Sequence, residues 1–113
     1  MKNSIPILRI FDEKKAKEIY LDFLEFKVDR EHRYADDLPL YMQISFGECI
    51  IHLSEHHGDC CPGATLRIEV NNIKALHAKL LSKKYKYARP GRDEDELCVT
   101  DPFGNKITFF RES

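Results

Sequence analysis

Two stretches of the chain repeat hydrophobic side chains at the spacing of an amphipathic helix. The spacing is i, i+3, i+4, i+7, i+8, and it is met by Ala16, Ile19, Tyr20, Phe23 and Leu24 and again by Ile73, Leu76, His77, Leu80 and Leu81. Every member of the second set follows its counterpart by 57 residues, and the same offset carries Phe46-Gly47 onto Phe103-Gly104. The shared offset predicts an internal structural repeat.

Runs rich in β-branched and aromatic residues flank each predicted helix, one before it and three after it. They span residues 5–11, 27–34, 40–46 and 49–54 in the first half and 64–70, 85–89, 96–100 and 106–110 in the second. Asp12, and either Asn71 or Asn72, are the expected helix caps. We therefore predict one α+β domain over residues 1–113. Two β-α-β-β-β repeats (about 4–58 and 63–112) form a curved mixed sheet in it, with the helices on the convex face.

Alternation along the strands separates an apolar face from a mixed one. The apolar set, expected beneath the helices, is Leu8, Ile10, Ile51, Leu53, Leu66, Ile68, Val70, Ile107 and Phe109. The opposite, helix-free face carries Arg9, His52, Thr65, Arg67, Glu69 and Thr108, together with the apolar Ile50 and Phe110. Such a face either meets solvent or encloses a pocket with a few placed polar groups.

Composition excludes several classes of partner. The 18 basic and 19 acidic side chains leave a formal charge of -1, so nothing electrostatic favours nucleic acid or a membrane surface. No apolar run approaches the roughly 20 residues of a membrane helix, and residues 1–8 do not resemble a secretory signal. Cys60 and Cys61 are adjacent and no Cys-x-x-Cys pair occurs, so we expect reduced thiols and a cytoplasmic protein.

The densest group of ligand-type side chains runs from His52 through Glu55, His56 and His57 to Cys60 and Cys61. Three interpretations fit this group: an unusual zinc or nickel site, polar contacts at a pocket rim, or an ordinary polar loop. The metal site would be unusual because the spacing of the residues matches no standard zinc pattern. Arg9 and Arg67 occupy corresponding strands, where they either clamp a carboxylate or phosphate or pair with a neighbour such as Glu69. His77 is expected to be a packed core histidine.

The order of elements and three sequence stretches resemble the glyoxalase, bleomycin-resistance and extradiol-dioxygenase superfamily, also called the vicinal oxygen chelate fold. The stretches are LRIFD (8–12), YLDFLEFKV (20–28) and VTDPFGNKI (99–107), and the resemblance covers residues 5–112. The second has Glu25 where the family usually has Gly. Residues 54–59 (SEHHGD) resemble the bleomycin-resistance branch.

The resemblance implies positions for a metal in those relatives that use one. Carried onto this chain, the four positions are Ile5, His52, Thr65 and Thr108. Only His52 is a good ligand, whereas catalytic divalent sites normally have three or more His or carboxylate ligands. The resemblance to the bleomycin-resistance branch instead implies a metal-free homodimer that protects by sequestering a small molecule.

The sequence thus predicts an antibiotic-like ligand held without metal, cofactor or catalytic residue, and the alternative is a metal-dependent lyase or isomerase of the glyoxalase type. The chain has no Trp, so stacking against a ligand would fall to Tyr and Phe residues, of which Tyr41 is one. The candidate ligand-binding residues are Arg9, Tyr41, His52, Glu55, His56, Arg67, Glu69 and Thr108.

Overall fold

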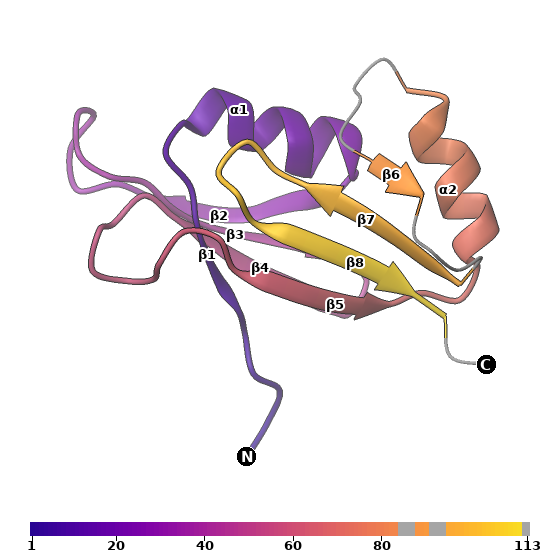
Figure 1. The fold of residues 1–113 in the computed structure, drawn as a ribbon. Coiled ribbons are helices and arrows are strands. Elements are labelled where there is room, and N and C mark those ends of the chain that lie inside the picture. Colours follow the sequence, from indigo (N-terminus) through magenta and orange to yellow (C-terminus); the bar gives the residue numbers. More distant parts are fainter. Residues whose placement is uncertain (84–87, 91–94, 112–113) are drawn as a thin grey trace.

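The computed structural model describes residues 1–83, 88–90 and 95–111 and confirms the α+β class (Figure 1). The first half contains β1 (Ile7–Arg9), α1 (Glu13–Lys17), a π-helical segment η1 (Glu18–Phe23), β2 (Lys27–His32), β3 (Tyr41–Phe46) and β4 (Cys49–Ser54). The second half contains β5 (Thr65–Glu69), α2 (Ile73–Leu81), β6 (Ala88–Pro90), β7 (Glu96–Thr100) and β8 (Lys106–Phe110). Among the described helices, none is both long and apolar enough to cross a membrane.

The two halves share one strand order. The sheets run β1-β4-β3-β2 and β5-β8-β7-β6, and in each the first strand of the half lies parallel to the fourth. The remaining neighbours are antiparallel. The predicted repeat therefore appears as two four-stranded mixed sheets, each with its own hydrogen-bonded ladder among the described residues.

Both predicted helix caps form. The Asp12 carboxylate accepts a hydrogen bond from the Lys15 amide at 3.0 Å, and Asn72, not Asn71, does the same for the Ala75 amide. The first helix widens into η1, where the Leu24 amide bonds to the Ile19 carbonyl five residues back. This π-type turn still buries Ile19, Tyr20 and Phe23, the apolar face that the spacing predicts.

The described core agrees with the predicted alternation in most places. Leu8, Ile10, Ile51, Leu53 and Ile107 are all nearly inaccessible to solvent. The helical spacing wrongly places Leu81 on the buried face. Leu81 lies in the last turn of α2 and is 47% exposed, because no described element covers that end. His77 is half-buried, with its Nε2 atom inaccessible and unpaired among the described residues.

Several element ends also differ from the pattern. β1 has three residues rather than seven, because only Ile7–Arg9 pair with β4. β2 ends at His32 and β3 begins at Tyr41. The predicted strand 85–89 is only partly visible: β6 starts at Ala88, and residues 85–87 lie outside the described residues.

A buried polar cluster in the Asp101-Pro-Phe-Gly-Asn105 turn joins the halves. The Asp101 carboxylate accepts hydrogen bonds from the Tyr20 hydroxyl (2.6 Å), the Asn105 side-chain amide (2.8 Å) and the backbone amides of Phe103 and Asn105. Asn105 also donates to the Arg9 carbonyl and accepts from the Ala64 amide. The turn thereby ties η1 and β1 to the start of β5 and β8.

Gly104 lets this turn close. Its φ is +90°, a left-handed conformation that side chains other than glycine adopt with strain. A Cβ atom at this position would also lie 3.8 Å from the Gly63 Cα in the linker between the halves.

A second, exposed link holds the end of η1 against α2. Glu25 has a φ of 65°, which is unusual for a residue with a side chain, and Lys79 and Lys83 each reach its carboxylate at 2.6 Å. Lys83 also donates to the carbonyls of Asp22 and Phe23. The hydrogen bonds from Lys79 and then Lys83 lower the pKa of Glu25. Two lysines of the second half thus stabilise Glu25 in a backbone conformation that favours glycine.

We predict that Tyr20→Phe lowers the free energy of unfolding by about 1–3 kcal/mol, because a donor is removed from a buried carboxylate while the ring stays. Urea unfolding followed by circular dichroism measures the change. Tyr34→Phe, at a position 78% exposed, is the matched control and should change stability little. Equal stability of Tyr20→Phe and the native chain would contradict the role given to the cluster.

We predict that Glu25→Gln destabilises the fold by about 1 kcal/mol at neutral pH, because both ion pairs are lost while the strain of the positive φ is unchanged. Glu25→Gly should be less destabilising, because glycine removes that strain. A carboxylate with a lowered folded-state pKa contributes stability above its unfolded pKa and loses it as the pH falls through the folded pKa. The difference between native chain and Glu25→Gln should therefore vanish in acid. A difference that persists there contradicts the electrostatic account.

Candidate functional site

The helix-free face of the first sheet carries a chain of hydrogen bonds. Gln43 on β3 lies directly opposite His52 on β4, and its Oε1 is 2.9 Å from the His52 Nε2. The Tyr41 hydroxyl lies 2.6 Å from the His52 Nδ1. Residues 41, 43 and 45 alternate with the buried Met42 and Ile44, so the strand itself places them on this face.

The orientation of this chain follows from Asp29 on β2. Its carboxylate accepts hydrogen bonds from the Gln43 Nε2 (3.1 Å) and the Ser45 hydroxyl (3.0 Å). Since a carboxylate only accepts, the Gln43 amide nitrogen faces Asp29 and its oxygen faces His52. The His52 Nε2 must then carry the proton, and its Nδ1 accepts the Tyr41 hydroxyl proton.

Burial and one nearby positive charge keep the His52 ring neutral. Burial, and to a smaller extent the positive charge of Arg30, lowers the pKa of His52. Burial, followed by the electrostatic effects of Asp59 and Cys60, raises the pKa of Tyr41. Both side chains are therefore uncharged at neutral pH, and the Tyr41 oxygen has a lone pair left to accept a hydrogen bond from a ligand.

Of the predicted loop residues, His56 joins this group and Glu55 does not. The His56 ring centroid lies 6.4 Å from that of Tyr41. The Glu55 carboxylate instead accepts from the Leu40 amide at 2.9 Å and pairs with Arg33 at 3.8 Å. Glu55 thus anchors the chain before β3.

The two candidate arginines occupy different surroundings. The Arg9 guanidinium lies 4.9 Å from the Phe11 ring centroid, and its inaccessible Nη1 has no hydrogen-bond partner among the described residues. Arg67 pairs with Glu96 at 3.1 Å and stacks over Phe110 at 4.5 Å. The partner of Arg67 is therefore Glu96 of β7 rather than Glu69, the candidate that the sequence suggested.

The structure brings together Tyr41, His52 and His56 on the first sheet, and Arg67 and Thr108 as cross-strand neighbours on the second. Thr108 is buried, with its hydroxyl 3.6 Å from the Cys98 sulfur. Sequence reasoning missed Asp29, Gln43 and Ser45. Alternation with Tyr41 would have placed Gln43 and Ser45 on this face, whereas the approach of Asp29 depends on a bulge between Val28 and Arg30.

None of the described residues forms a group of three His, Cys, Asp or Glu side chains that would hold a metal ion. At the four positions implied by the family, Ile5 is exposed and lacks a donor atom, Thr65 is exposed and Thr108 is buried. His52 has both ring nitrogens engaged with Tyr41 and Gln43. The residues present thus do not fit a catalytic divalent ion.

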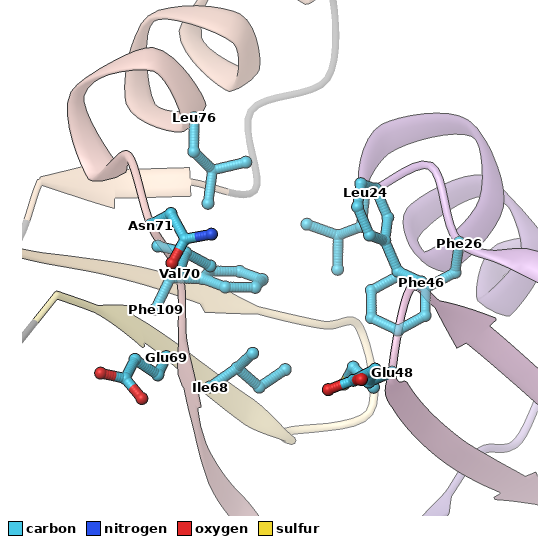
Figure 2. Close-up of a pocket in the computed structure, with 11 residues that line it drawn as sticks. Leu24, Phe26, Phe46, Glu48, Ile68, Glu69, Val70, Asn71, Leu76 and Phe109 are labelled. Atoms are coloured by element: carbon cyan, nitrogen blue, oxygen red, sulfur yellow. The ribbon is translucent and has the colours of Figure 1, made fainter.

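A separate cavity of about 410 Å³ opens between the two halves (Figure 2). Residues following η1, the β3–β4 turn, the end of β5, α2 and β8 line it: Leu24, Phe26, Phe46, Glu48, Cys49, Ile68, Glu69, Val70, Asn71, Leu76 and Phe109. Glu69 is the one predicted ligand-binding residue in this lining. Burial raises the pKa of the Cys49 thiol in the wall.

Paired β-α-β-β-β units, each with one four-stranded mixed sheet, define the class of fold that this chain adopts. Within that class, the family model described as glyoxalase superfamily protein matches residues 1–113, so the chain belongs to the glyoxalase superfamily. This confirms the resemblance seen in the sequence. No curated protein matches the chain.

Solved structures share the fold at low identity. The antibiotic-binding protein TnmS3 of Streptomyces sp. CB03234 is 19% identical with a TM-score of 0.77, over 100% of this chain and 99% of that one. A bleomycin-binding protein complexed with bleomycin is 14% identical with a TM-score of 0.72, over 100% of both chains. The trypanothione-dependent glyoxalase I of Leishmania major is 18% identical with a TM-score of 0.72, over 96% of this chain and 84% of that one.

We predict that His52 titrates below an ordinary histidine and that Arg30→Gln raises its pKa, because a nearby positive charge is removed. Nitrogen-detected NMR across a pH series reports the pKa. The same spectra identify the tautomer, expected to carry its proton on Nε2. Lys14→Gln, which removes a positive charge from an exposed position on α1, should leave the titration unchanged. A neutral ring protonated on Nδ1 contradicts the assigned hydrogen-bond chain.

Proposed function

We propose that this protein binds a small, antibiotic-like molecule without a metal and acts by sequestering it in the cytoplasm as a homodimer. Fold neighbours described as antibiotic-binding and bleomycin-binding proteins support the ligand class. Residues 1–113 act as one domain in this proposal, with repeat units about 4–58 and 63–112. No residue is assigned a catalytic role.

The state of His52 is the observation that carries the proposal. It is the one good metal donor at the four positions implied by the family, and both its ring nitrogens are used within the sheet. A metal ion would have to displace either the Tyr41 hydroxyl or the Gln43 amide. The same hydrogen bonds hold Tyr41 and Gln43 in fixed orientations, which is what a preorganised binding surface needs.

The division of the site between two sheets supports a homodimer. Tyr41, His52 and His56 belong to the first sheet, while Arg67 and Thr108 belong to the second, and no hydrogen bond among the described residues links these two groups. Both β1 and β5 are outer strands, and Ile5 and Ile7 beside the first face are exposed. A second copy that covers these apolar side chains would set a first-sheet face against a second-sheet face.

In the ligand-bound dimer, Tyr41 and His56 supply aromatic surface. The Arg9 and Arg67 guanidinium groups supply donors for an anionic or carbonyl group, and Glu69 and Thr108 supply further polar contacts. Glu55, the residue before His56, is fixed by the hydrogen bond that it accepts from the Leu40 amide.

We predict that bleomycin, or another member of an antibiotic panel, raises the melting temperature of the purified protein and is recovered chemically intact. Tyr41→Phe and His52→Ala should each weaken binding about tenfold, because each removes a positioned hydrogen-bonding group. Lys74→Ala, exposed on α2, is the control. Calorimetry gives the affinities and mass spectrometry the state of the ligand.

Two measurements separate this proposal from a metal-dependent lyase or isomerase. Elemental analysis should find no stoichiometric divalent ion, and EDTA should leave ligand binding unchanged. Light scattering should give the mass of two chains. A bound divalent ion together with a converted ligand would establish the enzymatic alternative, and absence of any ligand-induced shift would leave a scaffold without a binding function.

A further inference from the structure

The cavity between the halves lies on the opposite side of the sheets from the hydrogen-bond chain of His52. The alternation of side chains along the strands shows this. Phe46 lies on the same side of β3 as the buried Met42 and Ile44, and Cys49 lies on the same side of β4 as the buried Ile51 and Leu53. Ile68 and Phe109 likewise line the cavity from the core side of β5 and β8. The cavity therefore lies apart from Tyr41, His52 and His56, and of the residues proposed to bind the first ligand it includes only Glu69, at its edge.

Its walls are apolar and partly uncovered. Leu24, Phe26 and Phe109 are buried, but Phe46 is 53% exposed although it points to the core side. The rings of Phe26 and Phe46 meet edge to face with centroids 5.8 Å apart. Figure 2 shows Leu24, Phe26 and Phe46 on one side of an open gap, with Val70, Leu76 and Phe109 on the other. A volume of about 410 Å³ is within the range of small-molecule sites.

The charges at the edges of the cavity have one sign. No Lys or Arg lies among its lining residues, whereas Glu48 and Glu69 do. Within the described chain, neither carboxylate has an ion pair, unlike Glu13, Glu25 and Glu96. Figure 2 places the Glu48 carboxylate at one edge of the gap, across from Ile68, and the Glu69 carboxylate at the far edge. The electrostatic potential there favours a cation and opposes a carboxylate ligand.

We propose that this cavity is a second ligand site, which takes a hydrophobic cation: a compact apolar or aromatic body with one ammonium group. The body packs against Phe26, Phe46 and Phe109 and covers the open side of Phe46. The ammonium group lies at the edge of the cavity beside Glu48, where the Phe46 ring adds a cation–π contribution.

Three naphthalene probes of similar size test the charge requirement on the full chain: 1-naphthylmethylammonium, 1-naphthylmethanol and 1-naphthoate. Calorimetry should rank their affinities cation above alcohol above carboxylate. The double variant Glu48→Gln/Glu69→Gln should weaken the cation about three- to tenfold and leave the alcohol unchanged. Asp36→Asn/Asp37→Asn removes the same charge from an exposed loop and should leave all three affinities unchanged.

Phe46→Ala tests the location, since it should weaken the cation and the alcohol alike. NMR titration should shift the amide signals of Cys49, Val70 and Leu76, and Tyr41→Phe should not alter binding of the cation. That last variant keeps failure of this proposal distinct from failure of the metal-free function. Equal affinities for the cation and the alcohol would overturn the proposal, as would NMR shifts confined to the face of His52. The proposal would also be wrong if no probe binds and the protein is an oligomer that Phe46→Ala dissociates, because Phe46 would then belong to an interface between chains.

Discussion

The arrangement of the two halves depends on one buried carboxylate. Burying a charge is costly unless it is fully hydrogen-bonded, and Asp101 meets this condition with donors from both halves of the chain. Tyr20 reaches it from η1, and Asn105 extends the contact to the Arg9 carbonyl of β1. Any relative shift of the halves would leave a buried acceptor unsatisfied, so the cluster gives their packing a defined geometry that apolar contacts alone would not.

The same packing creates two surfaces with different chemistry. On the helix-free side, alternation exposes neutral hydrogen-bonding groups held in place by Asp29 and Gln43. On the core side, the apolar faces of the halves diverge near Phe46 and leave the cavity edged by Glu48. A fold made of two packed sheets therefore offers a polar recognition surface and an apolar cleft, and Glu69 is the one proposed ligand-binding residue that also lies at the edge of the cleft.

Much of the fold was predictable because interactions between residues close in the sequence determine its helices and strands. The helical spacing of Ile19, Tyr20 and Phe23, the alternation around Ile51 and the cap at Asp12 all act within a few residues. The candidate site was predictable only in part. His52 and Tyr41 were identified, but their partner Gln43 was not, because a glutamine on a strand carries no signal until the register places it opposite the histidine.

By itself, the sequence determined the repeat, the α+β class and the family, because periodicity and the Asp-Pro-Phe-Gly-Asn turn can be recognised from the order of residues alone. Tertiary structure alone decided how the polar groups are used. It paired Arg67 with Glu96, engaged both nitrogens of His52 and opened the cavity between the halves. These outcomes depend on distances between segments far apart in the chain, and such distances exist only once the sheets have paired and packed.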